Sequence, residues 1–205
     1  MPRREDIQRI MILGSGPIKI GQAAEFDFSG SQACRALRAD GFEVILVNSN
    51  PATIQNDPEM ADRIYIEPLL PDVVRRILEI EKPDALLAGM GGQTALNLAS
   101  ALAHDGSLAR LGVELIGCNL ATIDEAEDRD LFKQVCEEVG LPVADAHACS
   151  SIDEVLLAAE RIGQFPLLIR PAFTLGGLGG GTAWNRGELV EISSQGILHS
   201  QIGQV

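Results

Sequence analysis

The chain has 205 residues, enough for one large or two small domains, and 46% of them are hydrophobic, so it can bury a core. Its formal net charge of −13 disfavours a nucleic-acid surface, which needs a basic stripe. No apolar run approaches the roughly 20 residues of a membrane span, and the first residues lack the apolar region of a signal peptide. The four scattered cysteines lack metal-ligand spacing and fit reduced thiols, so we expect a cytoplasmic protein that binds neither nucleic acid nor membrane.

The first part of the chain alternates short apolar runs with helical patterns, the order typical of a parallel α/β sheet. Strands are predicted at 9–13, 43–48, 63–66, 85–88 and 113–116. Helices are predicted at about 31–40, at about 74–82, where Pro83 ends the helix, and after Gly91 and Gly92. We therefore predict an α/β fold with a Rossmann-like, doubly wound parallel sheet within residues 1–120.

A second domain is predicted at 121–205. Two Ser/Thr-x-x-Glu patterns, Thr122 with Glu125 and Ser151 with Glu154, are typical of helix starts. Amphipathic helices follow both patterns, and a short strand then ends at Arg170. A strand near Thr182 and a last helix complete the pattern. Because this stretch holds few strands, we expect the truncated first part of a larger domain.

The most informative stretch is the glycine-rich segment 170–182. Five of the six residues at 176–181 are glycine, and the segment follows a short apolar strand that ends in Arg170. Consecutive glycines let backbone N–H groups approach a ligand and form a nest for an anion. The planar guanidinium of Arg170 matches phosphate oxygens. This combination favours a lid over nucleotide phosphates, and the alternative is a flexible surface loop between two strands.

The first glycine turn, Gly14-Ser15-Gly16, follows a strand and invites comparison with a dinucleotide-binding fingerprint. That fingerprint has a third glycine three residues after the second and an acidic residue at the end of the second strand. Here position 19 is lysine, and the second strand ends at Asn48 without a carboxylate. We therefore expect a tight turn that serves packing and does not bind NAD.

Several polar side chains follow the ends of the predicted strands. They are Asn48, Asn50, Thr53, Gln93, Thr94 and Asn97. Ligands of open α/β sheets bind at this edge, and a helix opened by Gly91-Gly92 could present its N-terminus to bicarbonate or a carboxylated intermediate. The alternative is that these side chains only fix turns, as Asn and Thr commonly do. Glu25 and Asp27 cannot be assigned a role from their residue types.

Six further blocks of sequence, together with the Arg170 segment, carry a resemblance that covers about residues 7–196. In chain order they are Leu13-Gly14-Ser15-Gly16-Pro17-Ile18 to Ile20-Gly21-Gln22 with Glu25-Phe26-Asp27-Phe28-Ser29-Gly30, Val47-Asn48-Ser49-Asn50-Pro51-Ala52-Thr53, Asp57-Pro58-Glu59-Met60-Ala61-Asp62, Tyr65-Ile66-Glu67-Pro68, Met90-Gly91-Gly92-Gln93-Thr94-Ala95-Leu96-Asn97, and Ala126-Glu127-Asp128-Arg129. Together they closely resemble the N-terminal, carboxyphosphate-forming section of carbamoyl phosphate synthetase large subunits, members of the ATP-grasp superfamily.

The resemblance implies a pre-ATP-grasp domain followed by part of an ATP-grasp domain. It implies an ATP-dependent ligase that makes carboxyphosphate from bicarbonate, aminates it with glutamine-derived ammonia, and phosphorylates the carbamate, for arginine and pyrimidine biosynthesis. It also places Arg129, Arg170, Gly176 and Gly177 at ATP, and it implies a glutaminase small subunit and the remainder of the large subunit as partners. No catalytic residue is assigned within this chain, and the ligands for Mg²⁺ or Mn²⁺ are expected beyond Val205.

Because part of the nucleotide cleft is expected beyond residue 205, we expect the chain alone to be inactive and to bind ATP poorly. Two alternatives stay open at this point. One is another ATP-grasp ligase of the biotin-carboxylase type, which the Asn48–Thr53 and Met90–Asn97 blocks disfavour. The other is a non-catalytic nucleotide-binding module.

Overall fold

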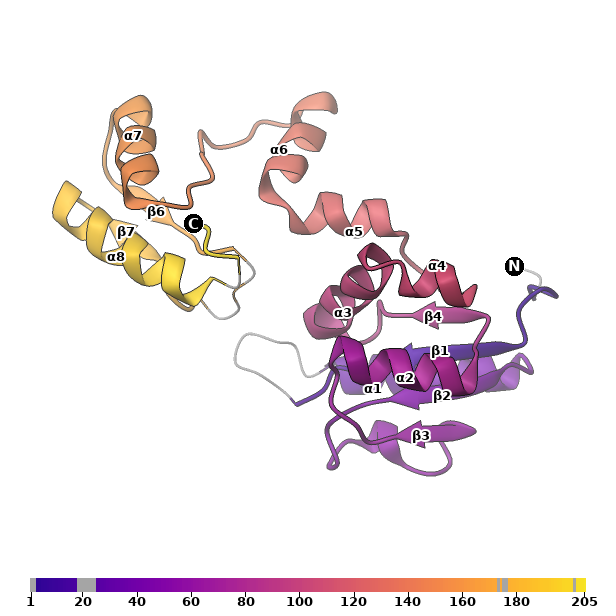
Figure 1. Cartoon of the computed structure of the whole chain (residues 1–205). Helices are drawn as coiled ribbons and strands as arrows, with labels where there is room; N and C mark the ends of the chain where they lie inside the picture. The colour runs from indigo at the N-terminus through magenta and orange to yellow at the C-terminus, as the bar shows by residue number, and fades with distance from the viewer. Residues whose placement is uncertain (1–2, 18–24, 173, 175–176, 201) are drawn as a thin grey trace. The chain divides into compact units, whose positions relative to one another are not determined.

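The computed structural model describes residues 3–17, 25–172, 174, 177–200 and 202–205 (Figure 1). The chain divides into two compact units, Met1–Ile123 and Asp124–Val205. None of the helices that the structure describes has the length and apolar character of a membrane-spanning segment.

The first unit is built on a parallel sheet with the strand order β3-β2-β1-β4-β5 (Figure 1). Its strands are β1 (Arg9–Leu13), β2 (Glu43–Val47), β3 (Arg63–Tyr65), β4 (Ala85–Leu87) and β5 (Glu114–Ile116). The order reverses between β3 and β4, where the chain crosses from one edge of the sheet to the other half. The predicted doubly wound sheet is therefore confirmed.

Helices cover the two faces of this sheet in separate layers. They are α1 (Glu25–Ala39), η1 (Ile54–Asn56, a 3₁₀ turn), α2 (Pro71–Glu81), α3 (Gly92–His104) and α4 (Ser107–Leu111). Met11 and Leu13 of β1 pack in the layer of α2, α3 and α4, whereas Ile10 and Ile12 pack in the layer that contains Cys34 of α1. This alternation buries both faces, as expected for a parallel sheet.

Helix α1 extends further toward the N-terminus than the sequence pattern predicted, since it includes Glu25 and passes through Gly30. The four cysteines are free thiols. Burial raises the pKa of the Cys34 thiol to about 11, so this thiol stays protonated and inert near neutral pH.

The second unit contains a two-stranded antiparallel sheet and helices. The elements from the unit boundary onward are α5 (Leu120–Glu127), α6 (Arg129–Glu138), α7 (Ile152–Ile162), β6 (Leu167–Ile169), β7 (Gly181–Ala183) and α8 (Arg186–His199). Val155, Ile169 and Leu189 form the centre of a small core between α7, the sheet and α8. The strands are few, as the sequence predicted.

The two predicted helix caps have different outcomes. Ser151 caps α7 as predicted, because its Oγ accepts a hydrogen bond from Glu154 N at 3.3 Å. The prediction for Thr122 is wrong. Asn119 lies before α5, and its Oδ1 accepts from Thr122 N at 2.8 Å, so Thr122 lies inside the first turn.

A buried glutamate at the end of α2 links this helix to strands β3 and β1. Glu81 is 2% exposed, and its carboxylate accepts hydrogen bonds from Arg63 Nη1 at 2.7 Å and from the Tyr65 hydroxyl. Arg9 donates to the main-chain carbonyl of Glu81. Burial alone would raise the pKa of Glu81, but the hydrogen bonds from Tyr65 and Arg63 hold that pKa below its ordinary value.

We predict that Glu81→Gln lowers the free energy of unfolding by about 1–3 kcal/mol near neutral pH, because a charge-assisted hydrogen bond is lost. A depressed carboxyl pKa stabilises the fold above the unfolded-state pKa, and this contribution is lost as pH falls through the folded-state pKa. The variant should therefore lose less stability on acidification below the ordinary value of 4.5 than the parent chain does. Urea unfolding measures both effects. Glu79→Gln, at an exposed position of the same helix, is the control and should change little.

Helix α3 begins in direct contact with the end of β1. A Cβ atom on Gly91 would lie 2.4 Å from the carbonyl oxygen of Leu13 and 2.6 Å from that of Gly14. Both obstacles are backbone atoms, which cannot rotate away. The absence of a side chain at Gly91 therefore sets the position of α3 over the sheet.

We predict that Gly91→Ala lowers the free energy of unfolding by about 1–3 kcal/mol, because α3 must shift away from β1. Gly89→Ala is the matched control in the same turn, since nothing lies within 4 Å of its Cβ position and its φ is not positive. The control should be neutral or slightly stabilising, because alanine reduces the entropy of the unfolded chain. Equal urea midpoints for the two variants would contradict the close contact.

Candidate functional site

The polar residues after β2 are used to shape the chain at the carboxyl edge of the sheet. Asn48 is fully buried, and its Oδ1 accepts from Asn50 N at 3.1 Å. Asn50 Oδ1 in turn accepts from Ala52 N at 3.0 Å, and Thr53 Oγ1 accepts from Gln55 N at 3.1 Å, which caps η1. The turn-fixing interpretation therefore holds for these three residues.

The polar residues of α3 face two different environments. Gln93 Nε2 donates to Asn97 Oδ1 at 2.8 Å, a pairing within one helix turn. Thr94 instead lines a hollow of about 420 Å³ at the carboxyl edge, together with Ser49. The other lining residues are Pro17, Ile66, Glu67, Pro68, Leu69 and Leu70. Thr94 thus lines a hollow large enough for a small ligand.

The first glycine turn serves packing, as the sequence indicated. A Cβ atom on Gly14 would lie 2.5 Å from Asn48 Nδ2, so this glycine makes room for a buried amide. Gly16 has a φ of +67°, a left-handed conformation that glycine adopts without strain. Asn48 occupies the position where a dinucleotide site would need an acidic residue, and its side chain faces the protein interior.

The predicted phosphate loop connects β6 to β7 as the loop of an antiparallel hairpin, in which Ile169 pairs with Gly181. Arg170 directly follows β6 and is exposed. Gly177 has a φ of +74°, and nothing lies within 4 Å of its Cβ position. Gly177 O accepts from Gly180 N at 3.1 Å, which closes a tight turn. Arg170 and Gly177 are thus carried by one loop.

The remaining predicted ATP contacts are only partly described. Gly176 lies outside the described residues. Arg129 is the first residue of α6, and its side chain is not described. Arg170 and Gly177 therefore lie on the same hairpin loop, and the placement of all four residues at ATP stays a prediction.

Packing accounts for two glycines that the sequence pattern grouped with the phosphate loop. A Cβ atom on Gly179 would lie 3.0 Å from His199 Cβ, and one on Gly180 would lie 3.0 Å from Ile169 O. From the other side, a Cβ atom on Gly196 of α8 would meet Gly179 O at 3.0 Å. The loop therefore packs against α8. Among the loop glycines at 177, 179 and 180, only Gly177 has no close contact that would exclude a side chain.

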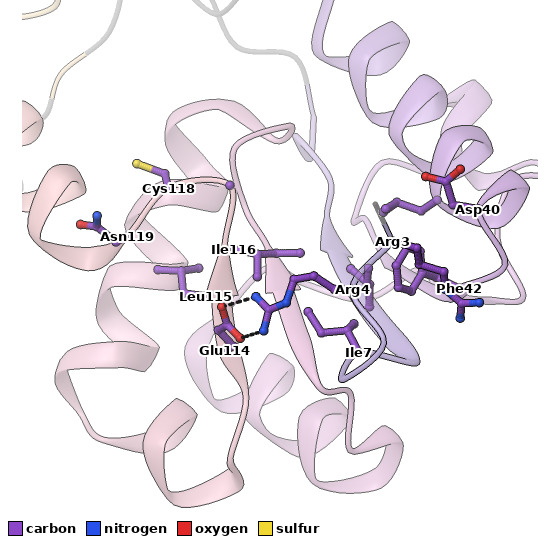
Figure 2. A pocket seen from close by; sticks show the side chains of 13 residues that line it. Arg3, Arg4, Ile7, Asp40, Phe42, Glu114, Leu115, Ile116, Cys118 and Asn119 are labelled. Atoms are coloured by element: carbon purple, nitrogen blue, oxygen red, sulfur yellow. Dashed lines mark hydrogen bonds and ion pairs between the residues drawn. The ribbon is translucent and has the colours of Figure 1, made fainter. Parts of the chain in front are cut away.

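A second hollow, of about 460 Å³, lies on the side of the sheet that carries α1 (Figure 2). Its walls include Ile7 and Ile116, and Figure 2 shows Arg4 reaching the carboxylate of Glu114 beside them. The two Arg4–Glu114 hydrogen bonds are both 2.7 Å long. Arg4 and Glu114 thus form an ion pair at the wall of this hollow.

Within the described part of the chain, no three His, Cys, Asp or Glu side chains come together as a metal site. On the hairpin loop, the described residues of the second unit thus supply an arginine and a glycine turn, and the described part of the chain holds no set of carboxylates for a divalent cation. This donor set fits anion binding and charge neutralisation at a phosphate.

Two family models match the chain, one over each unit. Residues 6–125 match the family described as "Carbamoyl phosphate synthase preATP-grasp domain". Residues 128–204 match "Carbamoyl-phosphate synthase L chain, ATP binding domain". Together the matches cover almost all of the chain.

Similar proteins agree with these matches. The chain is 60% identical over 205 residues to the carbamoyl phosphate synthase large chain of Archaeoglobus fulgidus, with 100% of this chain and 19% of the relative covered. It is 57% identical over 203 residues to the chloroplastic arginine-specific large chain of Arabidopsis thaliana, with 99% of this chain and 17% of the relative covered. The chain thus spans about a fifth of the length of the curated relatives it matches.

A solved structure shares the fold at low sequence identity. The biotin carboxylase domain of 2-oxoglutarate carboxylase from Hydrogenobacter thermophilus aligns with a TM-score of 0.70 and 18% identity, over 98% of this chain and 44% of that chain. The chain therefore shares its fold with this biotin carboxylase domain, and the sequence identity decides the family. The chain belongs to the carbamoyl phosphate synthase large-chain family, of which it carries the preATP-grasp domain and part of the ATP-binding domain.

Proposed function

We propose that this chain is the N-terminal part of the carboxyphosphate-forming site of a carbamoyl phosphate synthase. In the complete enzyme, ATP would activate bicarbonate to carboxyphosphate, ammonia would convert this to carbamate, and a second phosphorylation would give carbamoyl phosphate. The observation that carries the proposal is the match of both units, in order, to the two large-chain domains. The Hydrogenobacter thermophilus neighbour was solved with MgADP and bicarbonate, which supports the same pair of ligands here.

The proposed roles of the chain's own residues are binding and charge neutralisation. Arg170 would place its guanidinium against phosphate oxygens, and Gly177 would present backbone N–H groups in the same loop. Arg129 and Gly176 would complete the contacts from α6 and from the loop. Phosphoryl transfer depends mainly on positioning and charge neutralisation, which these groups can supply.

Mg²⁺ or Mn²⁺, when bound, would neutralise further charge on the transferred phosphoryl group. The described residues hold no cluster of carboxylates that could ligate it, so we propose that its ligands come from the remainder of the large chain. The same remainder and a glutaminase small subunit are the proposed partners, and the cytoplasm is the proposed location. The Arabidopsis thaliana relative is chloroplastic, so the location varies within the family.

The two alternative functions are weighed by different observations. A biotin-carboxylase-type ligase is disfavoured, because identity is 60% to the synthase large chain from Archaeoglobus fulgidus but 18% to the biotin carboxylase domain. A non-catalytic nucleotide-binding module would retain the hairpin loop around Arg170 without turnover. An activity measurement within a complete large chain separates this second alternative from the proposal.

We predict that the isolated chain shows no bicarbonate-dependent ATP hydrolysis and does not saturate with MgATP at about 1 mM. The reason is that the phosphates would be held only by the hairpin loop and Arg129, without a metal site among the described residues. A coupled assay for ADP release and titration calorimetry measure the two quantities. Bicarbonate-dependent turnover at the rate of a full-length large chain would contradict this prediction.

We predict that Arg170→Met lowers kcat for bicarbonate-dependent ATP hydrolysis about 10²-fold or more in a complete large chain. The test protein is the Archaeoglobus fulgidus large chain in which this chain replaces the matching 205 residues. Arg161→Met, an exposed arginine on α7, is the control and should leave kcat within about twofold, as expected for a surface substitution. If the two variants have the same kcat, Arg170 does not contact the phosphates.

A further inference from the structure

Helix α1 contains a glycine in its interior, at a place where alanine would favour the helix. Gly30 is buried, and a Cβ atom there would lie 2.7 Å from the carboxamide of Gln55. The glycine therefore makes room for a side chain from a distant part of the sequence.

Gln55 is the residue that occupies this space. It is 0% exposed, although glutamine is usually a surface residue. Its Nε2 donates to Phe26 O at 2.9 Å and lies 3.4 Å from Asp27 Oδ1, while its Oε1 accepts from Asn48 Nδ2 at 3.2 Å. All three partners belong to chain segments at the carboxyl edge of the sheet.

The partners also fix which way the carboxamide points. Phe26 O and the Asp27 carboxylate are acceptors, so they require the NH₂ group of Gln55. Asn48 offers an NH₂ donor, so it requires the oxygen of Gln55. A flipped carboxamide would place an acceptor against acceptors and a donor against a donor. Methionine or leucine could fill the same space, but neither could form any of these hydrogen bonds.

We propose that Gln55 is a positioning residue whose NH₂ group fixes Asp27 and the adjoining turn of α1 at the carboxyl edge of the sheet. The carboxylate of Asp27 also lies 3.4 Å from Ser15 Oγ. The hydrogen bonds of Gln55 to α1 therefore extend, through Asp27, to the turn after β1. This edge is where open α/β sheets bind their ligands. The proposal concerns the geometry of the edge and stands independently of the proposed function.

The first test uses two substitutions of similar size in the 205-residue chain. Gln55→Glu replaces the NH₂ donor by an oxygen that can donate only when the carboxyl is protonated. The introduced carboxyl would face Asp27 from α1, whereas its other described neighbours, Phe26, Gly30 and Asn48, are uncharged. Burial and the nearby Asp27 should raise the pKa of the introduced carboxyl. As pH falls, this carboxyl should become protonated and donate a hydrogen bond again, which restores the link to α1. Gln55→Met has no donor at any pH.

The readout is hydrogen exchange of the amides of residues 27–31, corrected for intrinsic rates. At about pH 8 we expect both variants to lose protection tenfold or more relative to the parent chain, because the link is absent in both. At about pH 5 we expect Gln55→Glu to recover most of this protection, whereas Gln55→Met stays unprotected. Parent-like protection in Gln55→Met, or the same loss at both pH values in Gln55→Glu, would overturn the proposal.

A second pair of variants keeps the proposal testable if either substitution prevents folding. Gly30→Ala alone should lower the urea midpoint, because the new Cβ meets Gln55. In a Gln55→Ala background the same Gly30→Ala change should raise the midpoint, because the obstacle is gone and alanine favours the helix. If Gly30→Ala has the same sign in both backgrounds, Gln55 does not hold α1 and the proposal is wrong.

Discussion

The arrangement of the first unit depends on one constraint. Every crossover between its parallel strands begins at the carboxyl ends of the strands and leads the chain back to their amino ends. Because the strands are parallel, the turn after β1, the segment after β2 and the start of α3 all lie at the carboxyl ends of the strands. These segments carry backbone groups that the sheet cannot satisfy. Buried amides satisfy them here, with Asn48 and Gln55 at the centre, and glycines at positions 14, 30 and 91 allow the close approach.

The strands and the fold class were predictable because long-range packing and local pattern agree in them. Val44 to Val47 form a continuous apolar run, and the structure buries all four residues between helix layers. Helix α1 was predicted to begin too late because Gly30 lies in its interior and disfavours helix locally. Its contact with Gln55 is 25 residues away along the chain, so no local pattern reports it. Asn119 was missed as a cap because Thr122 offered an equally good pattern three residues later.

The candidate site was predictable to a smaller extent, and by two different kinds of evidence. The strand, Arg170 and the glycine segment indicate a phosphate loop through their own chemistry. Arg129 carries no such signal, because an arginine at a helix start is ordinarily a surface residue, and it was predicted only through the resemblance of the whole chain. Gln55 was missed by both routes. The signal that could have found it is the pairing of an interior helix glycine with a glutamine four residues after a turn-forming Asn-x-Asn-Pro segment.

Two different physical causes require glycine at particular positions of this chain, and the difference bears on the phosphate loop. Gly14, Gly30 and Gly91 lack side chains because a Cβ atom would strike a neighbour at 2.4–2.7 Å. Gly179 and Gly180 have a milder form of the same cause, at 3.0 Å. Gly177 has open space at its Cβ position and a φ of +74°, so conformation alone demands glycine there. The turn at Gly177, on the same loop as Arg170, therefore differs in cause from the packing turns at Gly14 and Gly91.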